Sequence, residues 1–465
     1  MADVLQNIVA DKRVELESLM QALPLDTVKA NLTPSQKSLF AALSAPEAGY
    51  ILECKKASPS KGLIREVFDL DEIIAAYAPY AAGISVLTDE KYFQGKFEYL
   101  QYVTERVSQP VLNKDFFISE YQVYLARYYN ADAVLLMLSV LSDEEYRALA
   151  AVADSLQLDI LTEVSNEQEM HRAIALQASI IGINNRDLRD LSTDLATTKR
   201  LVPLLEQASH DYVVISESGI YTHEDVMRLS AHCHGFLVGS SLMAQQDLPA
   251  AVRELVYGNI KVCGLTSVQS AREAFGAGAN FGGLIFAEKS KRAVTLAQAS
   301  DIVSTVPGRY VGVFVNATVE EVAQAANQLS LSAVQLHGDE DASYRESLAV
   351  LLPDGCEIWQ ALGVSQLLPA NFDSVMAESA VSRVLLDCQV GQEKGGTGQQ
   401  FDWALLQDIE DKSRIVLAGG ITIDTIQQAQ ATGAAIVDVN SGVEDAPGQK
   451  SADKLTALFA HVRQY

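Results

Sequence analysis

Short apolar segments alternate with segments of helical period along the whole chain, and this alternation constrains the fold more than any other feature. In the first half, eight segments are typical of β-strands: residues 50–55, 84–87, 110–114, 133–138, 159–163, 180–184, 212–217 and 235–239. Helical patterns lie between them, for example over residues 143–156 and 223–230. Strands that alternate with helices form parallel sheets with right-handed crossovers, and eight such units favour a closed (β/α)₈ barrel.

The second half repeats this pattern without a helical preamble. Its predicted strands are residues 260–263, 281–286, 310–314, 333–336, 357–361, 383–386, 414–417 and 435–439. Residues 1–48 have a helical character and precede the first strand, so they form an extension outside the barrel. The sequence therefore predicts an α/β protein of two consecutive (β/α)₈ barrels, residues 1–256 and 257–465, the first with an N-terminal helical extension.

Composition narrows the possible partners. The chain is 48% hydrophobic and 20% charged, which is ordinary for a globular protein, and its net charge of −25 argues against a nucleic-acid partner. The five cysteines are scattered, and no apolar run reaches the length of about 18 residues that a membrane span needs. We expect a monomeric cytoplasmic protein that acts on small molecules and binds neither nucleic acid nor membrane.

An internal repeat predicts two phosphate sites. Residues 213–220 (VVISESGI) and 415–421 (IVLAGGI) align, and the same offset of 201 residues pairs Gly219 with Gly420 and Ser240 with Ser441. Each copy consists of a strand, a Ser/Gly turn, a helix and a strand that ends in Gly or Ser. Barrels build phosphate sites from the loops after strands seven and eight in this way. Gly/Ser turns are also ordinary loop chemistry, but two matched copies favour the phosphate sites.

Ionisable residues occupy the carboxyl ends of several strands in the first half, where barrel enzymes place their active sites. They are Glu53, Lys55, Lys114, Glu163, Asn184, Arg186, Glu217 and Ser218. Taken singly, a strand-end charge is more often a solvated rim residue, and Lys114 and Glu163 could form a structural ion pair. Their convergence favours an acid–base enzyme that acts on a phosphorylated small molecule.

The motifs ECKKASPSKG, ISVLTDEKYFQG, NKDF, LTEV, GINNRDL and SESGI, in this order, resemble indole-3-glycerol phosphate synthase over residues 1–255. That family closes the indole ring of 1-(2-carboxyphenylamino)-1-deoxyribulose 5-phosphate with loss of carbon dioxide and water. The resemblance implies that Lys114 is the general acid and Glu163 the general base. It also implies that Glu53 and Lys55 orient the substrate, supported by Asn184, Glu217 and Ser218. The implied substrate-binding residues are Ser58, Ser60, Phe116, Arg186, Gly219, Gly239 and Ser240.

In the second half, two groups with acid–base chemistry stand at predicted strand ends. Cys263 follows the first strand, before Gly264, and is either a buried small residue or a reactive thiolate. Asp387 follows an apolar run and precedes a loop with the sequence GGTG at 395–398. A carboxyl group there can act as a general acid if apolar surroundings raise its pKa. Its neighbour Cys388 should point the opposite way, behind the barrel.

The motifs KVCGLT, GLIFAEKSKR, VQLHGDE, LAGGI and DVNSGVE resemble phosphoribosylanthranilate isomerase across residues 257–465. The family carries out an Amadori rearrangement of a ribosylamine. The resemblance implies that Asp387 is the general acid and Cys263 the general base, for which we expect a lowered thiol pKa. The implied substrate-binding residues are Arg292, His337, Gly395, Gly396, Gly419, Gly420, Asn440, Ser441 and Gly442.

We therefore expect a bifunctional enzyme of tryptophan biosynthesis in which the second barrel supplies the substrate of the first. Neither reaction needs an organic cofactor or a metal, and the adjacent residues His232, Cys233 and His234 diverge too much on a helix to form a metal site. Two alternatives remain open. One is a pair of other phosphate-binding barrels, such as the isomerase of histidine biosynthesis, which would use two aspartates. The other is a phosphosugar-binding protein in which one barrel has lost catalysis.

Overall fold

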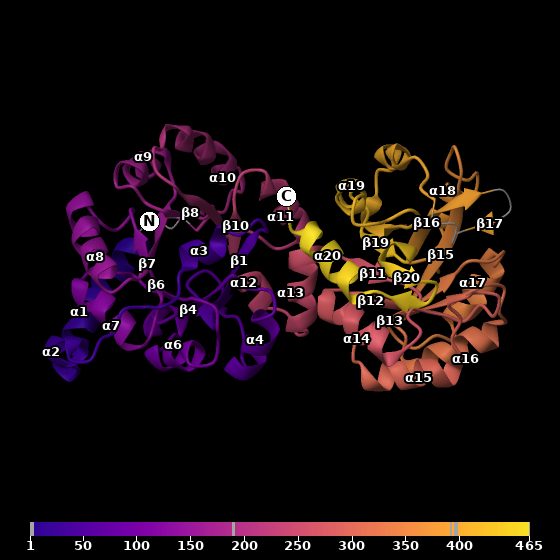
Figure 1. The fold of residues 1–465 in the computed structure, drawn as a ribbon, viewed down its shortest axis with the longest axis horizontal. Coiled ribbons are helices and arrows are strands. Elements are labelled where there is room, and N and C mark those ends of the chain that lie inside the picture. The colour runs from indigo at the N-terminus through magenta and orange to yellow at the C-terminus, as the bar shows by residue number, and fades with distance from the viewer. Residues whose placement is uncertain (1–3, 188–190, 391–392, 395–398, 465) are drawn as a thin grey trace. The chain divides into compact units, whose positions relative to one another are not determined.

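The computed structural model describes residues 4–187, 191–390, 393–394 and 399–464. The chain divides into two compact units, and the boundary falls between Val256 and Tyr257. In each unit, parallel strands stand at the centre and helices surround them (Figure 1). The predicted class of two consecutive (β/α)₈ barrels is confirmed.

The first unit contains a closed parallel barrel of eight strands. They are β1 (Gly49–Cys54), β4 (Gly83–Leu87), β5 (Val111–Lys114), β6 (Ala133–Met137), β7 (Asp159–Val164), β8 (Ile180–Asn184), β9 (Val213–Glu217) and β10 (Gly235–Val238). β10 pairs with β1 and closes the ring. A short antiparallel hairpin, β2 (Ala57–Ser58) and β3 (Gly62–Leu63), follows the first strand.

Helices connect these strands on the outside. They are α4 (Leu70–Tyr77), α5 (Glu90–Phe93), α6 (Phe97–Thr104), α7 (Glu120–Tyr128), α8 (Asp143–Ser155), α9 (Glu167–Ala175), α10 (Ala196–Leu201), η1 (Val202–Gln207), α11 (His223–Ser230), α12 (Ser240–Met243) and α13 (Leu248–Tyr257). Local chemistry fixes where several begin. At the start of α8, for example, Ser142 and Glu145 form a reciprocal capping box that satisfies two free backbone N–H groups.

The N-terminal extension consists of α1 (Val4–Ala22), α2 (Leu25–Lys29) and α3 (Leu39–Leu43). Leu39 and Leu43 of α3 pack against the first residues of β4 and β1, where Gly83 and Gly49 leave room for them. Leu5 and Ile8 of α1 are buried in the same apolar cluster as side chains from the barrel strands. The extension is therefore part of the barrel's core.

A buried lysine anchors α1. The ammonium of Lys12 is 1% exposed and lies 2.8 Å from Asp89 and 2.9 Å from Asp115, with Glu15 at 2.7 Å. Asp115 also accepts a hydrogen bond from the backbone N–H of Phe116, directly after β5. The anchor thus joins the extension to the segment that follows Lys114.

The second unit contains a closed parallel barrel of β11 (Ile260–Val262), β12 (Phe281–Ile285), β13 (Arg309–Phe314), β14 (Ala333–Leu336), β15 (Glu357–Val364), β16 (Arg383–Val390), β18 (Ile415–Leu417) and β19 (Ile436–Val439). β17 (Glu393–Lys394) pairs with β16, and β20 (Glu444–Ala446) with β21 (Gln449–Lys450). The helices are α14 (Val268–Ala277), α15 (Leu296–Thr305), α16 (Val319–Leu329), α17 (Ala342–Ala349), α18 (Phe372–Met376), η2 (Trp403–Asp408), η3 (Lys412–Arg414), α19 (Ile426–Ala431), η4 (Ser441–Val443) and α20 (Ala452–Val462).

All sixteen predicted barrel strands are present, and most of their ends agree within one residue. β15 and β16 differ: each runs several residues beyond its predicted end because the two remain paired as far as Val364 and Cys388. Asp387 therefore lies within β16 and not after it. This pairing between strands distant in sequence leaves no local signal.

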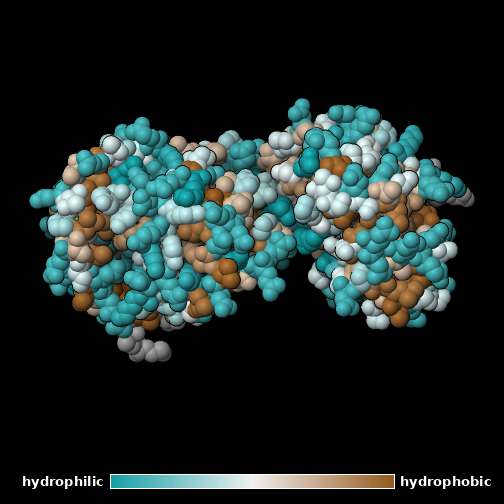
Figure 2. Space-filling view, turned by 90° about the horizontal axis from the view of Figure 1, so that it is seen from below, coloured by the Kyte–Doolittle hydropathy of each residue, from teal (hydrophilic) through white to brown (hydrophobic). Residues whose placement is uncertain are grey.

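The surfaces are mainly hydrophilic. On the face shown in Figure 2, polar and charged residues cover most of each unit, with smaller apolar patches between them. Within the described ranges, none of the helices has the length and apolar character needed to cross a membrane.

Candidate active sites

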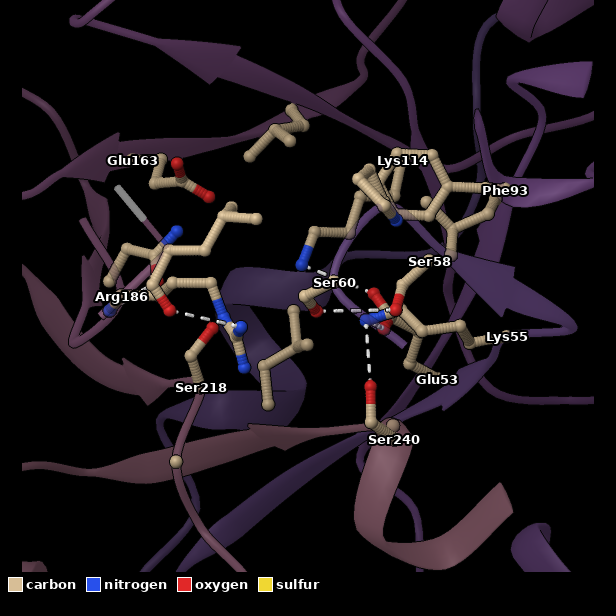
Figure 3. A pocket seen from close by; sticks show the side chains of 18 of the residues that line it. Glu53, Lys55, Ser58, Ser60, Phe93, Lys114, Glu163, Arg186, Ser218 and Ser240 are labelled. Carbon is tan, nitrogen blue, oxygen red and sulfur yellow. Dashed lines mark hydrogen bonds and ion pairs between the residues drawn. The ribbon is translucent and has the colours of Figure 1, made fainter. Parts of the chain in front are cut away.

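The first barrel has a cavity of about 130 Å³ at the carboxyl ends of its strands (Figure 3). The apolar side of this cavity includes Val4, Leu5 and Ile8 of α1. Thirteen of the residues predicted from the sequence line it: Glu53, Lys55, Ser58, Ser60, Lys114, Phe116, Glu163, Asn184, Arg186, Ser218, Gly219, Gly239 and Ser240. Strands that are far apart in sequence thus bring the predicted residues to one place.

Lys114 lies between two buried carboxylates. Its ammonium is 3.1 Å from Glu53 Oε2 and 3.2 Å from Glu217 Oε2, at the ends of β1 and β9. Burial opposes a charge on Lys114, but Glu53, Glu217 and Glu163 outweigh this effect and raise its pKa. Lys114 therefore carries its proton at neutral pH. Glu217 is not among the residues that line the cavity and meets it through Lys114.

Glu53 also binds Lys55, on the same side of β1, at 2.5 Å. Burial would raise the pKa of Glu53, but Lys114 and Lys55 outweigh it and lower the pKa to about 2. Burial lowers the pKa of Lys55. Lys55 Nζ lies 3.5 Å from Ser240 Oγ and 6.0 Å from the centre of the Phe93 ring. This lysine thus links the ends of β1 and β10, which are neighbours in the closed barrel.

Glu163, at the end of β7, has a different environment. Burial, reinforced by the charge of Glu217, raises the pKa of Glu163 to about 8, although Lys114 acts in the opposite direction. Lys114 forms its ion pairs with Glu53 and Glu217, and this arrangement does not support a structural ion pair between Lys114 and Glu163. A carboxyl group with this pKa can exchange a proton near neutral pH.

The turns after β9 and β10 complete the wall of the cavity beside β1. Ser218 and Gly219 both have positive φ angles, 65° and 79°, which place the turn after β9 in the left-handed region. After β10, a Cβ at Gly239 would collide with the carboxylate of Glu53, so only glycine fits this close approach. The short helix α12 begins at Ser240.

The second barrel has a cavity of about 660 Å³ at the equivalent end. Eight of the predicted residues line it: Cys263, Arg292, His337, Asp387, Gly419, Gly420, Asn440 and Ser441. Gly442 is not among the lining residues; it packs against the backbone of Ile421. Gly395 and Gly396 lie outside the described residues.

Cys263 is 4% exposed and packs against Ile285 and Val313. Burial raises the pKa of its thiol, although the charge of Lys261 opposes this shift. The expected lowered pKa is therefore wrong for this structure. The sequence showed the strand-end position of Cys263 but not how completely packing would remove it from water.

Asp387, on β16, lines the same cavity as Cys263, and neighbouring backbone groups fix its carboxylate. Its Oδ1 accepts a hydrogen bond from the backbone N–H of Cys388 at 2.7 Å. A Cβ at Gly419 would lie 2.8 Å from the same oxygen, and the φ angle of 88° there also requires glycine. Cys388 is buried and does not line the cavity, as its position on the strand predicts.

Arg292 is fixed by the hairpin that follows the last strand. Its guanidinium makes three contacts of 2.7–3.1 Å with Glu444, and Lys450 binds Glu444 at 2.9 Å. On another side of the cavity, the ring of His337 contacts the amide of Gln335. Neither Glu444 nor Lys450 was predicted from the sequence, because their role depends on a turn of the chain back toward Arg292.

Comparison with known proteins decides the family. Residues 5–255 match the family model of indole-3-glycerol phosphate synthase, and residues 260–461 match that of N-(5'-phosphoribosyl)anthranilate isomerase. The tryptophan biosynthesis protein TrpCF of Vibrio cholerae is 53% identical over 465 residues, which cover all of this chain and 97% of that protein. Those of Vibrio parahaemolyticus and Salmonella typhi are 54% and 51% identical, with 95% and 100% of their length covered. The chain belongs to the TrpCF family.

As a TrpCF protein, the chain is a bifunctional tryptophan-biosynthesis enzyme with a synthase domain and an isomerase domain. The resemblance inferred from the motifs is confirmed. Among the described residues of this TrpCF chain, no group of three or more His, Cys, Asp or Glu side chains could hold a metal ion.

Proposed function

We propose that the isomerase barrel of this TrpCF protein opens N-(5'-phosphoribosyl)anthranilate by acid–base catalysis. Asp387 donates a proton to the ring oxygen, and the ring opens. Cys263 then removes the C2′ proton, and the resulting enolamine tautomerises to 1-(2-carboxyphenylamino)-1-deoxyribulose 5-phosphate. The position of both groups on the wall of one cavity supports this assignment. Arg292, held by Glu444, contacts the anthranilate carboxylate, and His337 borders the substrate.

The synthase barrel, residues 1–256, then closes the indole ring with loss of carbon dioxide and water. Lys114 is the general acid that assists loss of the carbonyl oxygen, and Glu163 is the general base in the dehydration. The observation that carries this assignment is the contrast between them. Carboxylates raise the pKa of Lys114, whereas burial raises that of Glu163 toward neutrality, so the two groups hold their protons with very different strength.

The other residues of the synthase pocket orient the substrate. Glu53 and Lys55 polarise it, with Asn184 and Glu217 in support, and Phe116 and Arg186 flank the anthranilate ring. The phosphate binds at Ser58, Ser60, Ser218, Gly219, Gly239 and Ser240. In the isomerase barrel, residues 257–465, the phosphate of the substrate binds at Gly395, Gly396, Gly419, Gly420, Asn440 and Ser441, and Gly442 lets the chain pack closely behind them. Backbone N–H groups after the last two strands are the donors that such sites use.

One assay tests both assignments. Phosphoribosylanthranilate is supplied to the purified protein, and formation of indole-3-glycerol phosphate is followed. Lys114→Ala should stop the sequence at the aminodeoxyribulose, which accumulates, whereas Asp387→Asn should leave the first substrate unconsumed. Accumulation of the same compound in both variants would contradict the division of labour between the barrels. We also propose that the protein acts in the cytoplasm, because all five cysteines are free thiols. We propose further that it is a monomer.

A further inference from the structure

A buried ion pair lies directly beside Cys263 in the isomerase barrel. Lys261 and Asp438 are register partners on β11 and β19, and their side chains meet at 2.6 Å between Nζ and Oδ2. The Lys261 side chain is 0% exposed. Alternate residues of a strand share a face, so Lys261 and Cys263 point the same way. Buried ion pairs are often no more stabilising than apolar residues of similar size, so stability alone does not account for this pair.

The ion pair extends to the cavity. Asp438 lines it together with Cys263 and Asp387. Its second oxygen, Oδ1, is buried and has no hydrogen-bond partner within the described part of the chain. On the other side of the pair, the charge of Lys261 acts on the sulfur of Cys263, which stands two residues further along on the same face of the strand. Lys261 is not among the lining residues, so it acts on the cavity through Cys263 and Asp438.

The charged groups that act on the sulfur are three cations and one anion: Lys261, Lys450, Arg292 and Asp438. Glu444 binds both Lys450 and Arg292, so their charges are compensated by a carboxylate of their own. β12 and β13 contribute apolar contacts from Ile285 and Val313. Lys261 is also paired, with Asp438, but among these cations it has the largest effect on the sulfur, and it stands two residues before Cys263 on the same face.

We propose that Lys261, held by Asp438, is the positioning residue that stabilises the charged, basic form of the Cys263 sulfur during isomerisation. The inference rests on the proposed role of Cys263 as general base. The sulfur takes the C2′ proton, and Lys261 keeps its own protons throughout. Asp438 fixes the ammonium and limits its effect on the sulfur.

The two partners of the pair should shift the thiol in opposite directions. Lys261→Met removes the stabilising cation, so the midpoint for alkylation of Cys263 by iodoacetamide should move to higher pH by about one unit or more. Asp438→Asn removes the opposing anion, so the midpoint should move to lower pH. Peptide mass spectrometry distinguishes Cys263 from the other four cysteines, and the ascending limb of isomerase kcat against pH should move with each midpoint.

Circular dichroism melting of residues 257–465 reports in each variant whether the isomerase barrel is folded, and Lys412→Met, outside the cavity, is the matched control. An unchanged midpoint in a folded Lys261→Met variant, or shifts of the same sign in both variants, would overturn the proposal. If Lys261→Met does not fold, the acid shift of Asp438→Asn decides alone. A Cys263→Ser variant with normal isomerase turnover would instead refute the proposed base. An inactive Cys263→Ser with unshifted midpoints would refute only the role of Lys261.

Discussion

Glu163 occupies a place where burial disfavours its charged form, and this makes the stability of the synthase barrel depend on pH. Its pKa is raised from the ordinary value of 4.5 to about 8. A raised carboxyl pKa means that the folded state favours the proton. The resulting stabilisation is complete below about pH 4.5 and is lost as the pH rises to about 8.

Glu163→Gln should remove the loss of stability that the wild type shows as the pH rises. We expect the melting temperature of the variant, relative to the wild type, to be higher at about pH 9 than at about pH 5. Calorimetry at the two pH values measures the difference. Glu144→Gln, at an exposed position on α8, is the control, and its melting temperature should differ from that of the wild type by the same amount at both pH values. A pH-independent difference for Glu163→Gln would mean that its pKa is not raised.

Cys263 and Cys54 are both buried at the ends of first strands, yet they should respond differently to alkylation. Burial raises the pKa of both thiols, and Glu53 raises that of Cys54 further, whereas Lys261 opposes the shift at Cys263. We expect iodoacetamide to abolish the isomerase and spare the synthase. Cys263→Ser should also nearly abolish isomerase turnover, because a hydroxyl is a far weaker base than a thiolate.

Cys356→Ser is the matched control for the cysteine substitution, since Cys356 lies in the turn before β15 and outside the cavity. Its isomerase turnover should equal that of the wild type. Parallel loss of both activities on alkylation would place the sensitive thiol elsewhere.

Much of the site was predictable because it follows a topological rule: polar residues at the carboxyl ends of parallel strands meet. Glu53, Lys114 and Asp387 were found in this way. Lys261 could have been found, since it stands two residues before Cys263 on the same face. The direction in which the pKa of Cys263 shifts could not have been predicted, because it depends on the balance between burial and charges from other strands.

At the scale of elements, α1 is the feature that local patterns did not place. Its lysine looks like any solvated helix lysine, and its partners Asp89 and Asp115 belong to loops after β4 and β5. The positions of the barrel strands, by contrast, could be predicted from the alternation of strand and helix patterns, because periodicity is a local property of the sequence.

Lys12→Met should separate the extension from the barrel. It leaves the buried carboxylates of Asp89 and Asp115 without their cation, which should cost about 3–5 kcal/mol of unfolding free energy in the first unit. Because α1 lines the synthase cavity, kcat/KM of ring closure should fall by about tenfold or more, whereas the isomerase should not change. Denaturant titration and the two assays measure these effects.

Lys91→Met provides the control for that substitution. Lys91 of α5 pairs with Asp11 of α1, but the two side chains are 62% and 40% exposed. Exposed ion pairs contribute little, so stability and ring closure should remain close to the wild type. Equal effects of the two substitutions would show that the buried anchor has no special role.

At the scale of the whole molecule, each unit contains a complete barrel and its own cavity. We expect residues 1–256 and 257–465, produced as separate chains, each to unfold cooperatively and to retain only its own reaction. Circular dichroism melting and the two assays test this. Unfolded halves, under conditions where the full chain is stable, would show that the units depend on each other.

The anchor of α1 also has a consequence for the order of events on the ribosome. Lys12 leaves the exit tunnel about 100 residues before Asp115, which corresponds to roughly 5–20 s of synthesis. During that interval the apolar face of α1, with Leu5 and Ile8, has no barrel to cover. Until the barrel strands have been made, this face of α1 is therefore open to non-native contacts.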